Sequence, residues 1–70
     1  MILQKFTTPE EDRNLTIEKI EHHPLHWVIG QIWLTFNSKL MKTAKTLKGI
    51  EKEKQRLIEK WNLKEININD

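Results

Sequence analysis

The sequence predicts a mainly α fold in one small domain, residues 1–70, built on a long amphipathic helix over about residues 24–62. Three observations predict this fold. An apolar stripe keeps its phase at 100° per residue within an arc of roughly 140°. Pro24 suits a helix start. A chain of 70 residues without cysteine has a marginal core and no disulfide, so we expect oligomerisation or a partner to cover the stripe. The stripe comprises Leu25, Val28, Ile29, Ile32, Trp33, Phe36, Leu40, Leu47, Ile50, Leu57, Ile58 and Trp61.

The N-terminal segment allows two interpretations. Thr8, Pro9 and Glu11 form a helix-start pattern, which predicts a short helix over residues 9–22 that folds back on the long helix as a hairpin. Leu15-Thr16-Ile17 alternates, however, as a strand does. The alternative is an α+β fold in which a β-hairpin of residues 2–6 and 14–20 accompanies the long helix.

Gly49 is the one candidate break in the long helix. Because Ile50, Leu57 and Trp61 continue the phase of the stripe, we expect the helix to run through Gly49. Within the stripe, Lys54 and Thr43 weaken the apolar pattern. The tail, residues 63–70, alternates through Ile66 and Ile68, which predicts a short edge strand or a frayed end.

A second apolar set lies opposite the stripe in the first half of the expected helix. Trp27, Leu34 and Met41 recur every seven residues, and Gly30 beside them would let another backbone approach closely. This pattern favours a partner interface, although residues 1–22 could cover the same face instead. Tryptophan and phenylalanine are common interface anchors, so the predicted interface comprises Trp27, Gly30, Leu34, Met41, Trp33, Phe36 and Trp61.

The second half of the expected helix carries a basic column opposite the stripe. Such a column could follow the phosphates of a nucleic acid or an acidic protein surface, and it could equally be a solvated lysine face. Its members are Lys42, Lys45, Lys48, Lys52, Arg56 and Lys60. Residues 31–70 carry nine basic and five acidic groups, a net of +4, whereas residues 1–30 have a net of −2.

Little in the sequence indicates catalysis or a cofactor. There is no cysteine or tyrosine, and only two glycines, Gly30 and Gly49, so we expect no phosphate-binding glycine loop, no cofactor and no enzymatic activity. The three histidines His22, His23 and His26 surround Pro24, which breaks the helical spacing that a metal site would need. We expect them to make local hydrogen bonds.

The sequence therefore favours a non-enzymatic protein-interaction module, such as a small helical adaptor, inhibitor or accessory subunit. The partner is expected to be another protein or a second copy of the chain. The alternative is a nucleic-acid-binding protein that uses the face from Lys42 to Lys60. The most apolar window, residues 25–36, is too short to span a membrane. Absence of cysteine fits the cytoplasm or another reducing compartment.

Overall fold

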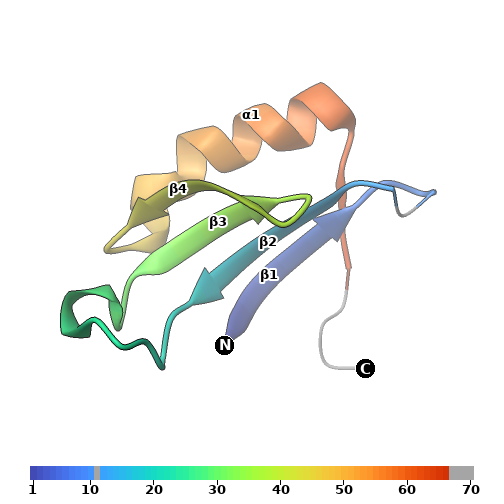
Figure 1. Cartoon of the computed structure of the whole chain (residues 1–70). Coiled ribbons are helices and arrows are strands. Elements are labelled where there is room, and N and C mark those ends of the chain that lie inside the picture. The colour runs from blue at the N-terminus through green and yellow to red at the C-terminus, as the bar shows by residue number, and fades with distance from the viewer. Residues whose placement is uncertain (11, 67–70) are drawn as a thin grey trace.

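The chain folds as an antiparallel five-stranded sheet with one helix on one face, and the computed structural model describes residues 1–10 and 12–66 (Figure 1). The strand order is β4-β3-β2-β1-β5, so consecutive strands are neighbours except for β5, which joins the free edge of β1. The elements are β1 (Ile2–Thr7), β2 (Asn14–Lys19), η1 (His26–Val28), β3 (Ile32–Phe36), β4 (Lys39–Ala44), η2 (Leu47–Ile50), α1 (Glu51–Trp61) and β5 (Lys64–Glu65).

Alternating side chains explain the two central strands. In β2, Leu15 and Ile17 are fully buried, whereas Thr16 between them is half-buried on the opposite face. In β3, Leu34 is fully buried and Trp33 faces the other way. One face of the sheet therefore forms the core and the other, which we call the open face, meets solvent.

A two-residue turn joins β3 to β4. Asn37 and Ser38 both have positive φ, 52° and 67°, as a two-residue hairpin turn whose twist matches the strands requires. Asn37 also holds the turn against β2, because its backbone N–H donates to the Asn14 carbonyl at 2.8 Å and its Oδ1 accepts from the Asn14 N–H at 2.9 Å.

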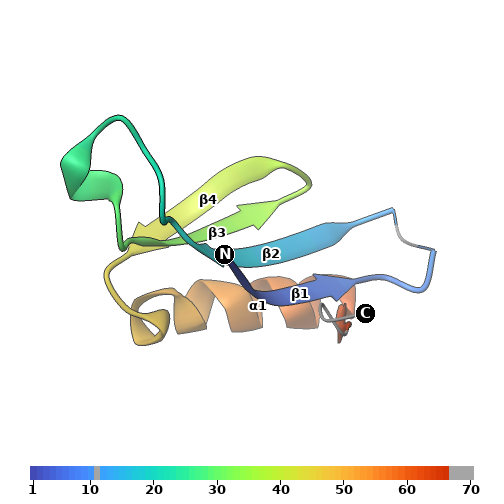
Figure 2. The same ribbon diagram turned by 90° about the horizontal axis from the view of Figure 1, so that it is seen from below.

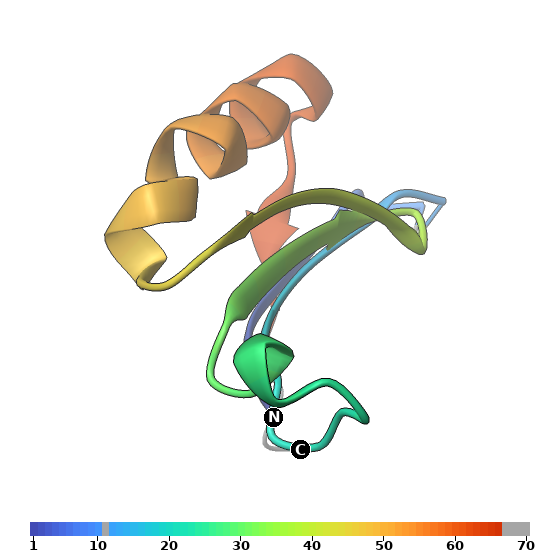
Figure 3. The same ribbon diagram turned by 60° about the vertical axis from the view of Figure 1, so that its left-hand side comes forward.

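The helix α1 closes the core from the other side. Figures 2 and 3 show α1 lying across one face of the sheet while the opposite face has no second layer. Its buried residue Leu57 and the preceding Ile50 pack on the sheet residues of the core. The helix ends at Asn62, whose φ of 55° gives a left-handed cap. The core comprises Phe6, Leu15, Ile17, Ile32, Leu34, Ile50, Leu57 and Leu63.

Lys54 is a lysine inside this apolar layer, 9% exposed. Its ammonium group pairs with the Glu51 carboxylate at 2.9 Å and lies 3.5 Å from the Gln4 Oε1 on β1. The long methylene stem covers the core while the charge finds partners at its rim. Lys54, which interrupts the apolar stripe of the sequence, thus lies where α1 contacts β1.

The structure overturns the mainly α prediction. Neither a helix over residues 24–62 nor a short helix folded back over residues 9–22 exists: residues 14–19 form β2, residues 32–44 form a β-hairpin, and α1 covers only Glu51–Trp61. The alternative interpretation placed a hairpin at residues 2–6 and 14–20, where β1 and β2 do pair, but its long helix is wrong as well. The sheet and α1 bury part of the apolar stripe within one chain, including Ile32, Ile50 and Leu57, whereas Leu25, Ile29, Leu40 and Leu47 stay exposed.

Two further expectations have different outcomes. The helix does not run through Gly49, which lies in η2 between the sheet and α1. The tail does form a short edge strand over Lys64–Glu65, while residues 67–70, including Ile68, lie outside the described residues. Glu11 of the helix-start pattern also lies outside them.

Candidate interaction surfaces

The sequence-predicted interface residues separate into three environments. Leu34 is fully buried in the core, and Phe36 and Trp61 pack against it with their rings stacked, 6.2 Å between centroids. Trp33 is half-buried on the open face, and Met41 is 39% exposed on the edge strand β4. Only Trp27 is prominently exposed, at 71%. The seven residues therefore do not form one surface.

Trp61 is held by its own neighbours. The Arg13 guanidinium lies 4.1 Å from the centre of its ring, and the Lys60 ammonium lies 5.3 Å away. Together with the stacked Phe36, these contacts engage the aromatic ring from within the chain. Trp61 thus closes the end of the core near the β3–β4 turn and is not a free anchor.

Trp27 stands on the ordered loop that joins β2 to β3. At the base of the loop, the Gly30 N–H donates to the Ile20 carbonyl at 2.7 Å, and the Ile20 N–H donates to the Gln31 carbonyl at 3.0 Å. Gly30 has a φ of +92°, and nothing lies within 4 Å of where its Cβ would be. Glycine adopts this backbone conformation more readily than other residues, and the close approach of a partner's backbone at Gly30 stays a prediction.

Further contacts fix the loop internally. The Val28 N–H donates to the Leu25 carbonyl at 3.1 Å within η1, and the Val28 side chain is buried. The His23 Nδ1 accepts from the Leu25 N–H at 3.0 Å, while the His23 ring meets the Trp33 ring edge-on at 6.1 Å. In Figure 2 the loop rises on the side of the sheet away from α1.

The loop holds three large apolar side chains in solvent. Leu25 is 43% exposed, Trp27 71% and Ile29 46%, and they occur at alternate positions around η1. We call these three residues the Trp27 surface. Of the three histidines, His23 makes the local hydrogen bond that was expected, and no group of three metal-ligating side chains occurs among residues 1–10 and 12–66.

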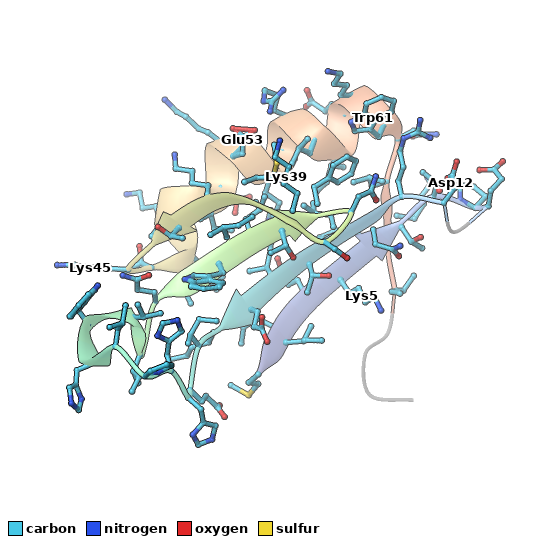
Figure 4. All side chains as sticks on the ribbon, viewed as in Figure 1. Lys5, Asp12, Lys39, Lys45, Glu53 and Trp61 are labelled. Carbon is cyan, nitrogen blue, oxygen red and sulfur yellow. The ribbon has the colours of Figure 1, made fainter. Side chains whose placement is uncertain are left out.

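Seven exposed basic residues lie along β4, η2 and α1. Figure 4 shows Lys39 on β4, with Lys45 where the chain turns toward η2. Lys39 joins the set only because the sheet places it on β4. We call this set the basic band; it comprises Lys39, Lys42, Lys45, Lys48, Lys52, Arg56 and Lys60.

Among the described residues, two carboxyl groups have a lowered pKa: Asp12, which precedes β2, and Glu51 at the start of α1, between Lys48 and Lys52 of the basic band. A hydrogen bond from the Thr8 hydroxyl, 2.5 Å from Asp12 Oδ1, lowers the pKa of Asp12, with Arg13 assisting. Hydrogen bonds from Gln55 and Lys54 lower the pKa of Glu51. Both shifts stabilise an ordinary ionised carboxylate, which is the opposite of what a general acid needs.

One concave feature of the described surface is too small for an ordinary small-molecule site. A shallow cavity of about 180 Å³ lies beside the end of β2, below the 300 Å³ or so at which small-molecule sites usually begin. It is lined by Met1, Glu18, Lys19, Ile20, Glu21 and His22. No helix within the described part of the chain is long and apolar enough to cross a membrane.

Comparisons with known proteins give no relative: no family model, no curated protein and no solved structure matches this chain.

Proposed function

We propose that this chain is a small non-enzymatic protein-binding module whose partner contacts the Trp27 surface. The main support is the exposure of Trp27, 71%, on a loop held by backbone hydrogen bonds. Tryptophan is the residue type most enriched among the few that dominate interface energies. A partner with an apolar pocket would bury it, with Leu25 and Ile29 as flanking contacts.

Order in the loop supports this assignment. A flexible loop would lose conformational entropy on binding, whereas this loop is already fixed by backbone hydrogen bonds at its base and by Val28 in its interior. The exposed side chains are also not needed for the core, whose residues come from β1–β3, η2 and α1, together with Leu63. A partner could therefore bury them without unfolding anything.

The partner is another protein or a second copy of the chain, and one pair of variants tests both. Trp27→Ser removes the anchor. Leu40→Ser is the control. Leu40 is an apolar residue as exposed as Ile29 of the Trp27 surface, 45% against 46%, but it lies outside that surface, beside the β3–β4 turn. Light scattering and analytical ultracentrifugation measure self-association; proteins that co-purify with the chain are then purified and their binding measured by calorimetry.

We expect Trp27→Ser to weaken association at least about 30-fold, corresponding to the 2 kcal/mol or more of an interface hot spot. Leu40→Ser should change it less than about threefold. Equal affinity of the wild type and Trp27→Ser for a purified partner would refute the proposal, as would a monomeric chain that binds none of the co-purified proteins.

A further inference from the structure

The basic band is the strongest charged feature of the molecule. Residues 39–60 contain eight basic and three acidic side chains, a net of +5, while the whole chain has a net of only +2. Folding therefore concentrates positive charge on one part of the molecule and leaves the remainder acidic. Two of the three acidic groups are already engaged, Glu53 with Arg56 and Glu51 with Lys54.

The lysines of the band are free of such pairing. No described carboxylate lies within 4.0 Å of the ammonium groups of Lys39, Lys42, Lys45, Lys48, Lys52 or Lys60. Like charges this dense repel one another and lower the stability of the folded chain by a few tenths of a kcal/mol for each close pair. A polyanion bound along the band would relieve that repulsion.

The basic band has two arms, one along β4 and one along η2 and α1. Lys54 reaches Gln4 on β1, so the side of α1 that carries Lys54 faces β1. At 100° per residue, Arg56 and Lys60 lie about 160° and 120° around the helix from Lys54, on its solvent side, where both are exposed. On β4, Lys42 pairs with the buried Leu34 and shares its face of the sheet, yet it is exposed. The helix thus leaves this face of β4 uncovered at Lys42, and basic side chains are exposed on β4 and on α1.

Edge protection does not account for the whole band. Lysines and a bulge are usual devices against unwanted strand pairing, and β4 has Lys39 and Lys42 together with a register shift opposite Leu34 and Thr35. That explanation covers the strand only. The basic residues of η2 and α1, which include Lys48 and Lys52, do not border a strand edge.

We infer that the basic band binds the phosphate backbone of a nucleic acid without reading its sequence. Each arm is roughly 18–20 Å long, from the rise per residue of a helix or a strand, and could contact several phosphates. Lysine suits phosphate contacts, whereas protein interfaces are depleted in it. A membrane surface fits less well, because the apolar face of α1 is buried in the core.

Absence of base selectivity follows from the side chains in the band. Arginine, asparagine and glutamine make most specific contacts to base edges. Arg56 of the band is engaged by Glu53, and Gln55 beside it donates to Glu51. The Trp61 ring, which Lys60 approaches, is already contacted by Arg13 and Phe36, which leaves little of it for base stacking.

A matched pair of triple variants tests the inference. Lys42→Gln/Lys48→Gln/Lys52→Gln removes three charges from the band. Lys5→Gln/Lys19→Gln/Lys64→Gln removes the same charge from β1, β2 and β5, outside the band. Binding of fluorescently labelled 20-nucleotide single strands and 20-base-pair duplexes of two unrelated sequences is measured by anisotropy between 20 and 200 mM KCl. Circular dichroism and urea midpoints verify that both variants fold.

We expect wild-type affinity to fall about 10²–10³-fold between 50 and 200 mM salt and to be the same for both sequences. The band variant should lose roughly 30-fold at 50 mM salt and two to three units of the logarithmic salt slope, while the control loses less than about threefold. Equal losses in both variants, or no binding at 20 mM salt, would overturn the inference. Tighter binding of polyglutamate than of either nucleic acid would instead assign the band to acidic proteins.

Discussion

Gly49 is the residue on which the connection from the sheet to α1 depends. A Cβ at this position would lie 2.6 Å from the Cβ of Ala44, closer than two such atoms can approach. Gly49→Ala should therefore lower the free energy of unfolding by about 1–3 kcal/mol, the usual effect of overpacking, as measured by urea denaturation. In an uninterrupted helix the same change would raise stability by about 1 kcal/mol.

A double-mutant cycle with Ala44→Gly serves as the control. Removing the Ala44 methyl group should relieve part of the effect of Gly49→Ala, which gives a favourable coupling energy between the two sites. A stabilising Gly49→Ala, or an additive double variant, would contradict the contact between η2 and the end of β4.

Asp12 provides a residue-scale prediction on pH. Its pKa lies below the ordinary 3.8 because the Thr8 hydroxyl donates to it. A pKa lower in the folded than in the unfolded chain stabilises the fold above that ordinary value, and this contribution is lost as the pH falls through the folded pKa. Thr8→Val should raise the Asp12 pKa toward 3.8, as measured by NMR titration. An unchanged Asp12 pKa in this variant would show that the hydrogen bond is not the cause.

At the scale of elements, the β3–β4 hairpin is a local weakness that can be repaired. Ser38 has a φ of 67°, which a residue with a Cβ adopts at a disadvantage of roughly 1–2 kcal/mol. Ser38→Gly would create the Asn-Gly pair that this turn type favours, so we expect the free energy of unfolding to rise by about 1 kcal/mol. Thermal and urea denaturation measure the change.

Asn37→Gly is the appropriate comparison for that variant. It also relaxes a positive φ, but it removes the Oδ1 that accepts from the Asn14 N–H. We therefore expect it to give no net gain. If Ser38→Gly were neutral or destabilising, the turn would have a conformation other than the one described.

The β-elements explain why the sequence pattern was misleading. The alternation of Leu15-Thr16-Ile17 indicated a strand, and β2 confirms it. In β3, Ile32 and Phe36 are four apart and share a face both in a strand and in a helix, so these two positions fitted the helical stripe. Leu34 between them is the buried core position, although the helical pattern placed it opposite the stripe. Leu40 and Leu47 completed that stripe in the sequence, yet they are 45% and 43% exposed.

The candidate surfaces were predictable to different degrees. Six of the seven residues in the basic band were identified from their spacing. That spacing placed them on one long helix, whereas they lie on a strand, a turn and a shorter helix. The exposure of Trp27 was not predictable in this way, because its hydrogen-bonded loop is closed by residues on either side of it, Ile20 and Gly30. Only the pairing of β2 with β3 brings those two residues together.

At the scale of the whole molecule, the sheet and α1 form a frame that buries its own core. The Trp27 surface lies on the β2–β3 loop and the basic band lies along β4, η2 and α1, so each can change without altering the residues that hold the fold. This arrangement suits a small module with two separate contact surfaces, one apolar and one cationic.

Trp27 stands outside the core, and urea denaturation of Trp27→Ser measures whether the fold depends on it. We predict a change within about 0.5 kcal/mol of the wild type, as for other surface substitutions. Leu34→Ala in the same urea titration should lose about 2–5 kcal/mol, because Leu34 is fully buried. A loss of 3 kcal/mol or more in Trp27→Ser would mean that this tryptophan belongs to the core, and it would contradict the account.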